Sequence, residues 1–302
     1  MVKNLVLENI SVGFKLPQGV FYAVDDVSLN LPGGNFTAIV GESGCGKSVL
    51  GQAILNILPS GVVKKGRVLY NGEQVEKILT AFGIIPQNPS ESLNPVRKIG
   101  KQMQDILDVH KIADSDNSYK KQCLHLFGLQ EAERVMAAYP HELSGGMLQR
   151  VLCAMAVSSK PEWVLADEPT KGLDEQVGAV VRKNLLTIKL DLHLSMLIIT
   201  HDIALAQEVC DDVLVMYAGQ VLEHNADIWH KPLHPYTKGF LQALPKNGLQ
   251  VIPGKAPVPG ESFTGCKFAA RCPYCTTRCK EEMPAMQQVG NAEVRCFLYA
   301  EG

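Results

Sequence analysis

No stretch of this 302-residue sequence approaches the roughly 20 consecutive apolar residues that a membrane-spanning helix needs. The N-terminal residues MVKNLVLENI lack the basic start and the long apolar segment of a secretion signal. A strong charge of one sign is also absent, because 29 basic and 31 acidic residues give a net charge of −2. Such a balance provides no general attraction to nucleic acid. We therefore expect a cytosolic protein without a nucleic-acid partner, a location that is compatible with contact to a membrane protein.

Cysteine is plentiful, but its distribution argues against a disulfide framework. A cytosolic protein keeps its thiols reduced, so the nine cysteines are not expected to pair with one another. Five of them fall between Cys266 and Cys296, and this clustering needs its own explanation. The other four are scattered and are interpreted as small hydrophobic residues: Cys45, Cys123, Cys153 and Cys210.

Residues 41–48 read GESGCGKS and have the spacing G-x-x-x-x-G-K-[ST] of a phosphate-binding loop. An apolar run precedes them and a helical pattern follows, which is the context that this loop requires. The glycines let backbone N–H groups converge on one point, and the helix adds the positive end of its dipole. Lys47 is expected to reach the β- and γ-phosphates, and the Ser48 hydroxyl to ligate Mg²⁺. The nucleotide-binding residues predicted here are Gly41, Glu42, Ser43, Gly44, Cys45, Gly46, Lys47 and Ser48.

Alternating apolar and polar residues over 2–12 and 20–31 predict two half-buried strands before this loop. We interpret them as an antiparallel β-layer that leads into the phosphate-loop strand. Residues 66–72 predict a further strand closed by an Asn-Gly turn. Phe14 and Tyr22 are candidates to stack on adenine, although an aromatic residue near a strand more commonly belongs to the core.

A helical insert is predicted within an α/β core, over residues of about 88–158. A short strand from Phe82 to Pro86 leads to Gln87, after which apolar residues recur at helical spacing among many charges. Near the end of this region, residues 143–150 read LSGGMLQR. Ser144 is a favourable N-cap, and the two glycines that follow leave backbone N–H groups uncovered at a helix start, which makes a second anion site. By itself, however, S-G-G before a helix is a common cap.

Carboxylates follow the next apolar strand, Trp163 to Ala166, at the sheet edge where ligands bind in open α/β folds. Asp167 can hold Mg²⁺ through water and Glu168 can polarise an attacking water, the alternative being a solvated strand end. Another apolar strand, 196–199, ends in Thr-His-Asp, so His201 lies at the same edge, where it can contact a γ-phosphate or the lytic water. The turn between the two strands adds Asp174.

Taken in order, these motifs resemble the ATP-binding subunit of an ABC transporter over residues 1–245. The ordered set is GESGCGKS, Gln87, LSGGM, VLADEP, GLD and ITHD. The resemblance implies an α/β fold, namely a P-loop NTPase (ABC ATPase) core with an antiparallel β-layer and an inserted helical subdomain. It also implies hydrolysis of ATP with Mg²⁺. In that family two cassettes close head to tail, with each nucleotide between one phosphate loop and the other cassette's signature.

The resemblance assigns roles to matching residues. Glu168 is the general base, His201 contacts the γ-phosphate, and Gln87 links the nucleotide to the membrane subunit. The Mg²⁺ ligands are Ser48, Gln87 and Asp167. Phe14 matches the adenine-stacking position better than Tyr22 does. Asp174 is a further nucleotide-site residue. Ser144, Gly145 and Gly146 serve the partner's ATP.

The segments QNPSESLNP and HKPLHPYTKGFLQALP resemble the peptide/nickel importer branch of this family. Leu148 stands where peptide systems usually carry Arg and is closer to nickel or metal-chelate members, so the cargo is either a peptide or a nickel or metallophore complex. The stretch between Asn71 and Phe82 is shorter than usual in this branch. The resemblance implies a peripheral location on the cytoplasmic face of the membrane. The implied partners are a second ATPase subunit in a heterodimer, two transmembrane permease subunits and an extracytoplasmic substrate-binding protein.

After Leu244 the composition shifts to Pro and Gly, which marks a linker and predicts a Cys-rich extension over 246–302. Its cysteines are spaced C-x5-C-x2-C-x3-C-x16-C, and the last histidine is His234, so a metal site here would be all-thiolate. Structural zinc commonly uses paired C-x-x-C knuckles, of which there is one, whereas a 4Fe–4S cluster takes four thiolates with freer spacing. A metal is reasonable because about 55 residues are too few to fold on an apolar core alone.

Peptide-importer ATPases that this extension resembles carry C-x5-C-x6-C-x16-C and are associated with a 4Fe–4S cluster. Matching residue by residue selects Cys266, Cys272, Cys279 and Cys296 and leaves Cys275 extra. Zinc and the absence of any metal remain as alternatives. We thus expect an ATP-hydrolysing subunit that energises import. The alternatives are a soluble ABC ATPase that does not act in transport and a metal-sensing regulatory subunit.

Overall fold

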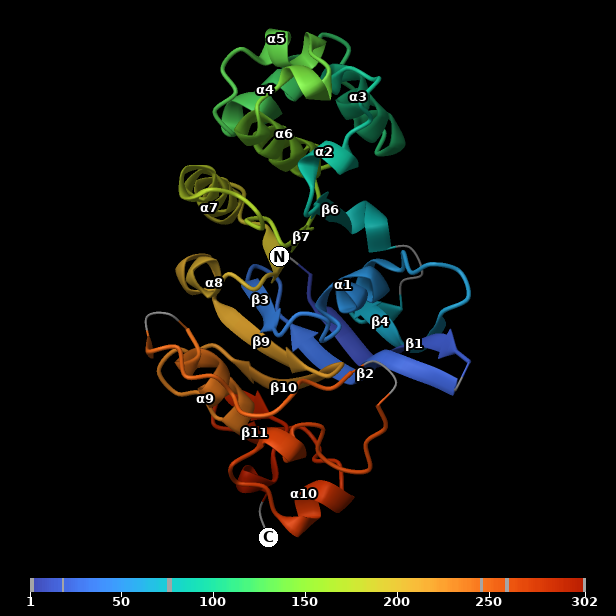
Figure 1. Cartoon of the computed structure of the whole chain (residues 1–302). Coiled ribbons are helices and arrows are strands. Elements are labelled where there is room, and N and C mark those ends of the chain that lie inside the picture. The colour runs from blue at the N-terminus through green and yellow to red at the C-terminus, as the bar shows by residue number, and fades with distance from the viewer. Residues whose placement is uncertain (1–2, 18, 75–77, 245–246, 259–260, 301–302) are drawn as a thin grey trace. The chain divides into compact units, whose positions relative to one another are not determined.

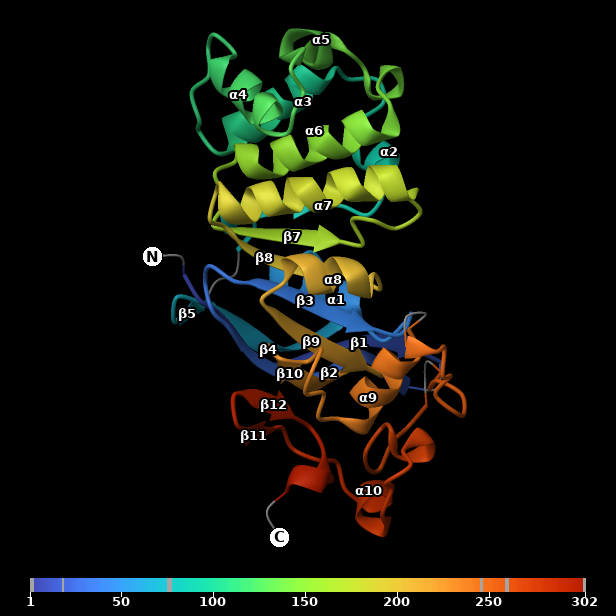
Figure 2. The same cartoon turned by 90° about the vertical axis from the view of Figure 1, so that its left-hand side faces the viewer.

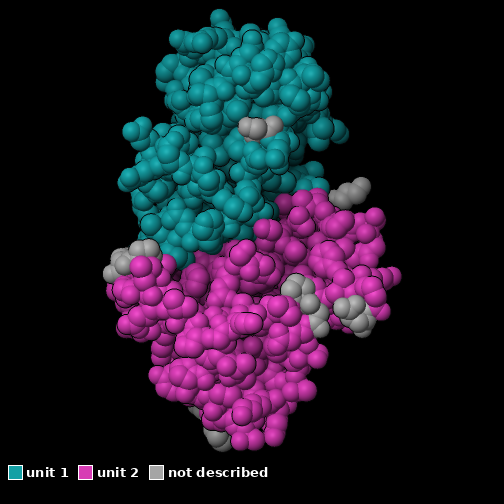
Figure 3. All heavy atoms as spheres, viewed as in Figure 1, with its two compact units in different colours: residues 1–4, 32–36, 76–209 teal, residues 5–31, 37–75, 210–302 magenta. Residues whose placement is uncertain are grey.

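The computed structural model describes residues 3–17, 19–74, 78–244, 247–258 and 261–300. The chain forms two compact units, each assembled from separate stretches (Figure 3). Unit 1 comprises residues 1–4, 32–36 and 76–209, and unit 2 comprises residues 5–31, 37–75 and 210–302. Among the described residues, no helix is both long and apolar enough to cross a membrane. The predicted boundary at residues 245 and 246 lies outside the described residues.

Unit 2 contains the antiparallel layer that the alternating pattern predicted. Its strand order is β2-β1-β4-β5, with Leu5 of β1 opposite both Leu31 of β2 and Tyr70 of β4. Asn71 and Gly72 both have positive φ, as a tight hairpin turn between β4 and β5 requires, so the predicted Asn-Gly turn is confirmed. The strands are β1 (Leu5–Leu16), β2 (Gly19–Leu31), β4 (Val63–Tyr70) and β5 (Glu73–Gln74).

A second sheet of unit 2 positions the phosphate loop. Its strand order is β11-β12-β10-β9-β3, in which β3 runs parallel to β9 and the other neighbours are antiparallel. Every residue of β3 and β9 is buried, which explains why both strands are mainly apolar. The strands are β3 (Phe36–Gly41), β9 (Asp212–Tyr217), β10 (Gln220–Asn225), β11 (Gln287–Val289) and β12 (Ala292–Val294). The helices of this unit are α1 (Lys47–Leu55), α9 (Pro235–Gln242) and α10 (Thr277–Glu281).

The Cys-rich extension joins unit 2 through a small aromatic cluster as well as through β12. The rings of Tyr217 in β9, Tyr236 in α9 and Phe268 in the extension lie with centroids 4.7, 5.4 and 5.4 Å apart. All three side chains are almost completely buried. Offset and edge-to-face packing of such rings stabilises a junction beyond the area that it buries. The extension therefore shares the core of unit 2.

Unit 1 contains a parallel sheet of order β8-β7-β6 and the helical insert (Figures 1 and 2). The strands are β6 (Phe82–Ile85), β7 (Trp163–Asp167) and β8 (Ser195–Ile199). The region predicted to be helical is so: α2 (Pro89–Ser92), α3 (Ile99–Val109), α4 (Ser118–Leu126), α5 (Ala132–Ala137) and α6 (Gly145–Ser158). Two helices follow, α7 (Glu175–Leu190) and α8 (Ile203–Val209), and α6 lies beside α7 (Figure 2).

Candidate functional site

The phosphate loop of unit 2 follows β3 and ends where α1 begins at Lys47. Its glycines are required by the surroundings. A Cβ on Gly41 would lie 2.1 Å from the Met216 carbonyl oxygen, and one on Gly46 would lie 2.1 Å from the Ala23 carbonyl oxygen. Gly46 also has a φ of 104°, which glycine adopts at little cost. At these two glycines the rest of the chain thus packs closely against the loop.

Lys47 is buried and its ammonium donates hydrogen bonds back to the loop. The Nζ atom lies 2.9 Å from the Gly41 carbonyl oxygen and 3.1 Å from that of Glu42. These carbonyls hold the cation over the curled backbone, where a phosphate on the N–H groups would meet it. Burial raises the pKa of the Cys45 thiol, which supports the interpretation of Cys45 as a neutral packing residue.

Two residues that the sequence patterns did not single out hold the second position of the loop. The Glu42 N–H donates to the Tyr236 hydroxyl at 3.1 Å. The Arg271 guanidinium donates to both carboxylate oxygens of Glu42 at 3.1 Å and to the Tyr217 hydroxyl at 3.3 Å. The Arg271 side chain is only 7% exposed, so this ion pair is shielded from water on the arginine side. The extension therefore contacts the phosphate loop directly.

In unit 1, the carboxyl ends of the parallel strands bring Gln87, Asp167, Glu168 and His201 to one sheet edge. Glu168 follows β7 with a φ of 48°, uncommon for a residue other than glycine, and its N–H donates to the Ile199 carbonyl oxygen at 2.7 Å. This conformation points the buried carboxylate at His201, with Oε2 2.5 Å from Nδ1. The prediction that His201 lies at the same sheet edge as the carboxylates is therefore confirmed, and its direct contact with Glu168 is a further finding of the structure.

The glycines of the LSGG segment have open surroundings. Ser144 is the N-cap of α6, and its Oγ accepts a hydrogen bond from the Met147 N–H at 3.3 Å. A Cβ added to Gly145 or Gly146 would meet no atom within 4 Å. Asp174 is likewise a cap, since its Oδ1 accepts from the Val177 N–H at 2.9 Å at the start of α7.

Phe14 lies half-buried in β1, directly opposite Phe21 of β2. Tyr22, the residue after Phe21 in β2, lies opposite Gly13 of β1. The predicted stacking residue and its alternative thus occupy adjacent rungs of one hairpin in unit 2.

The four matched cysteines of the extension line one cavity of about 170 Å³: Cys266, Cys272, Cys279 and Cys296. Cys275 is not among the described residues that line it. Burial raises the pKa of Cys266 to about 11 and also raises the pKa values of Cys272 and Cys296. In the part of the chain that the structure describes, no three His, Cys, Asp or Glu side chains converge closely enough to hold a single metal ion.

Three features together define an ATPase of the ABC class. They are the GESGCGKS loop between a buried strand and a helix, the carboxylate pair at the end of a parallel strand, and a second helix that starts with bare glycines. A family model described as "ABC transporter" matches residues 24–171, and one described as "Oligopeptide/dipeptide transporter, C-terminal region" matches residues 222–279. The chain belongs to the family of ATP-binding proteins of oligopeptide and dipeptide ABC transporters, and it hydrolyses ATP.

Relatives match over nearly the whole chain. The oligopeptide transport ATP-binding protein OppD of Haemophilus influenzae is 35% identical and the alignment covers 98% of both chains. AppD of Bacillus subtilis is 36% identical, covering 98% of this chain and 97% of that one. The dipeptide transport protein DppD of Escherichia coli is 35% identical over 95% and 94% of the two chains.

Solved structures are similar over the ATPase region. A bacterial ABC transporter cassette solved as a dimer is 26% identical, with a TM-score of 0.63, over 73% of this chain and 97% of that one. The CbiO1 protein of Clostridium perfringens, part of an ABC transporter complex, is 26% identical, with a TM-score of 0.61, over 74% and 88%.

Proposed function

We propose that this chain energises the uptake of peptides through a membrane transporter. The observation that carries the catalytic part is the Glu168 carboxylate, buried at the carboxyl edge of β7 and 2.5 Å from the His201 imidazole. The peptide cargo is supported by the names of the relatives, which are oligopeptide and dipeptide transport proteins. The alternative cargo, nickel or a metal chelate, is favoured by one residue only, Leu148.

In this proposal the backbone N–H groups of residues 43–48 and the Lys47 ammonium grip the phosphates, and Glu168 accepts the proton of the attacking water. His201 contacts the γ-phosphate and orients that carboxylate. Phosphoryl transfer asks mainly for positioning and charge stabilisation, which fixed N–H groups and one cation supply.

The proposed Mg²⁺ ligands are the Ser48 hydroxyl, the Asp167 carboxylate and the Gln87 amide. All three offer oxygen, the donor that Mg²⁺ prefers, so the donor set fits this ion. When bound, the ion neutralises charge on the phosphate oxygens. Ser144, Gly145 and Gly146 present a helix start to a second cassette's nucleotide, and Asp174 lies at the start of α7 in the same unit.

The proposed partners are a second ATPase subunit, two transmembrane permease subunits and an extracytoplasmic binding protein, with this chain at the cytoplasmic face of the membrane. Full-length similarity to transport ATP-binding proteins supports this assembly. Co-purification in detergent of two membrane subunits with the chain is the expected result. A chain that purifies with ribosomes or nucleic acid instead would favour a soluble ABC ATPase outside transport.

For the extension we propose a 4Fe–4S cluster held by Cys266, Cys272, Cys279 and Cys296, with zinc as the alternative. Four thiolates around one zinc ion all lie about 2.3 Å from a single point, whereas a cluster needs thiols spaced around a cavity. The cavity of about 170 Å³ lined by these four cysteines supports the cluster. When bound, a cluster supplies one-electron redox chemistry and a structural cross-link. A brown protein with about four irons per chain after oxygen-free purification is expected, and a colourless protein with one zinc would contradict it.

Glu168→Gln tests the catalytic assignment. The amide keeps the shape of the side chain but cannot accept a proton, so turnover in the assembled transporter is expected to fall by about 10²–10⁴-fold. ATP binding, measured by calorimetry, is expected to remain. Glu133→Gln, on the exposed face of α5, is the matched control and is expected to hydrolyse ATP normally. Unchanged turnover in Glu168→Gln would contradict the role of this carboxylate as the base.

Peptide uptake into vesicles that contain the whole transporter tests the cargo. ATP-dependent accumulation of a labelled dipeptide or oligopeptide is the expected result. Accumulation of a Ni²⁺ chelate without peptide uptake would favour the alternative.

A further inference from the structure

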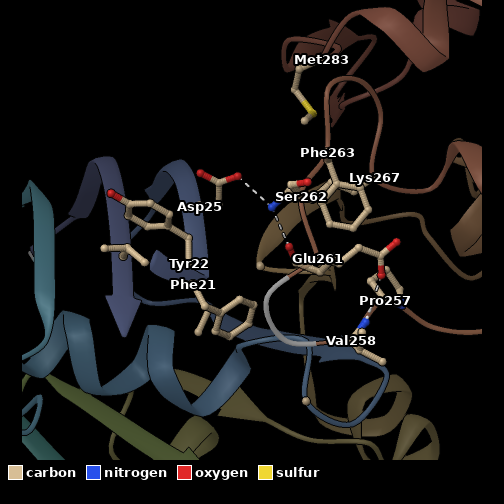
Figure 4. A pocket seen from close by; sticks show the side chains of 15 residues that line it. Phe21, Tyr22, Asp25, Pro257, Val258, Glu261, Ser262, Phe263, Lys267 and Met283 are labelled. Carbon is tan, nitrogen blue, oxygen red and sulfur yellow. Dashed lines mark hydrogen bonds and ion pairs between the residues drawn. The ribbon is translucent and has the colours of Figure 1, made fainter. Parts of the chain in front are cut away.

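A cavity of about 290 Å³ lies in unit 2 between strand β2 and residues 257, 258, 261–263 and 267 of the extension (Figure 4). Tyr22 and Asp25 line it from β2, and Ser262 and Phe263 line it from the extension. Gly44 of the phosphate loop is also part of its wall. A region more than 200 positions downstream in the chain thus faces the loop across an open space.

The extension is clamped in this position by a buried cation. The Lys267 Nζ lies 2.7 Å from the Asp25 Oδ2 and donates a hydrogen bond to the Ala218 carbonyl oxygen at 2.8 Å. The Lys267 side chain is 7% exposed, and its ammonium lies 5.7 Å from the centroid of the Phe263 ring. This places Phe263 by packing, so the ring does not depend on a ligand to reach the cavity.

Gly44 connects this cavity to the phosphate loop. Because Gly44 belongs to both, a ligand whose phosphates occupy the loop reaches the cavity with the group attached to those phosphates. A Cβ on Gly44 would meet no atom within 4 Å, so the backbone is open on this side. A volume near the lower end of the roughly 300–1,000 Å³ of small-molecule sites suits a sugar and a base.

The lining groups match that chemistry. The aromatic rings of Tyr22 and Phe263 offer faces on which a base can stack, and base–aromatic stacking is a substantial contribution to binding. Ser262 and Glu261 are exposed. The Ser262 hydroxyl and the Glu261 carboxylate can accept hydrogen bonds from hydroxyl or amino groups of a ligand. The Glu261 Oε2 already accepts a hydrogen bond from the Val258 N–H at 3.2 Å, which orients this carboxylate.

We propose that the C-terminal extension forms part of the nucleotide site: Phe263 contacts the base, and Ser262 and Glu261 contact the sugar or the base edge, of the nucleotide whose phosphates lie on the loop. This rests on the proposed ATP binding by residues 41–48. It gives the extension a direct part in nucleotide affinity, separate from any metal that its cysteines hold.

Calorimetry on the full-length chain tests this with two probes, Mg²⁺-ATP and Mg²⁺-tripolyphosphate, which has no sugar or base. Loss of stacking in Phe263→Ala is expected to weaken ATP binding about tenfold and to leave tripolyphosphate binding unchanged. Phe263→Leu, which keeps an apolar side chain and the packing under Lys267, is expected to show the same selective loss. Val251→Ala, on an exposed part of the extension, is the control and is expected to bind both probes normally.

Equal ATP affinity in the wild type and both Phe263 variants would overturn this inference but leave the proposed nucleotide site intact. A parallel loss of ATP and tripolyphosphate binding would also overturn it, because the extension would then act only on the loop. A wild-type chain that binds neither probe would overturn the proposed nucleotide site, and this inference with it.

Discussion

Glycines in the loop before α1 and at the start of α6 have opposite surroundings. In the loop before α1, a side chain on Gly41 or Gly46 would collide with the backbone of Met216 or Ala23. At α6, a side chain on Gly145 or Gly146 would meet nothing. The first pair is explained by the packing of its own chain, whereas nothing described in this chain requires the second pair. A surface that keeps its backbone bare without internal need is suited to a contact outside the chain, as the proposed cassette pairing demands.

Gly46→Ala is expected to give the largest effect. The new Cβ would lie 2.1 Å from a backbone oxygen at a φ of 104°, so the loop or β2 must shift. The free energy of unfolding is expected to fall by about 3 kcal/mol, and ATP binding is expected to be lost. Chemical denaturation and calorimetry measure both. Gly44→Ala is the comparison, because Gly44 also has a positive φ but has open space around it. A Gly46→Ala protein as stable as the wild type would remove the contrast between the glycines before α1 and those of α6.

Arg271→Gln tests how far the enclosed loop depends on the extension. Without the guanidinium, the Glu42 carboxylate lies unneutralised in the phosphate loop, and repulsion is expected to weaken ATP binding about tenfold. Glu42→Gln together with Arg271→Gln is expected to restore most of the affinity, because the repelling charge is gone. Arg134→Gln, an exposed residue paired with Glu131, is the control. No recovery in the double variant would show that Arg271 acts through packing and not through charge.

Gly145→Ala is expected to separate stability from pairing at the open helix start. Alanine favours a helix over glycine, so the free energy of unfolding is expected to stay constant or rise by up to about 1 kcal/mol. ATP-driven pairing of cassettes, measured by light scattering in a Glu168→Gln background, is expected to weaken. Normal pairing would mean that this helix start does not meet the second nucleotide.

His224→Gln is expected to give the smallest effect and tests the attachment of the extension. Burial lowers the pKa of His224, but hydrogen bonds to Asp212 at 3.0 Å and Glu293 at 3.3 Å outweigh it, and the net pKa is raised. Because the folded-state pKa lies above the unfolded value, the stabilisation is fully present below the unfolded pKa of about 6.5 and declines as pH rises through the folded one. The wild type is therefore expected to exceed His224→Gln in unfolding free energy at pH 6 and to lose this advantage by pH 9.

Much of the fold was predictable because its signals are local. The alternating pattern around Leu5 and Leu31, the Asn71-Gly72 turn and the apolar run before Asp167 each specify structure over a few residues. The site edge in unit 1 followed from the same logic, since the residues that follow parallel strands share one edge. The glycine loop was likewise readable from eight positions.

The rest depends on contacts between distant positions. Nothing near Arg271 or Tyr236 indicates that they meet Glu42, about two hundred positions earlier. The pairing of β12 with β10 and the packing of Phe268 on Tyr217 have no periodic signal, because the segments are short and rich in Pro, Gly and Cys. Lys267 reads as an ordinary surface lysine, although it is buried against Asp25.

The interleaving of the chain has a consequence for biosynthesis. The phosphate loop is translated well before its neighbouring strand β9, and its partners Tyr236 and Arg271 lie 194 and 229 positions after Glu42. Domains generally fold as units once their contacts are available. The nascent loop must therefore wait for these contacts until residue 271 has been made, and a protein truncated before that residue would never acquire the Arg271 contact.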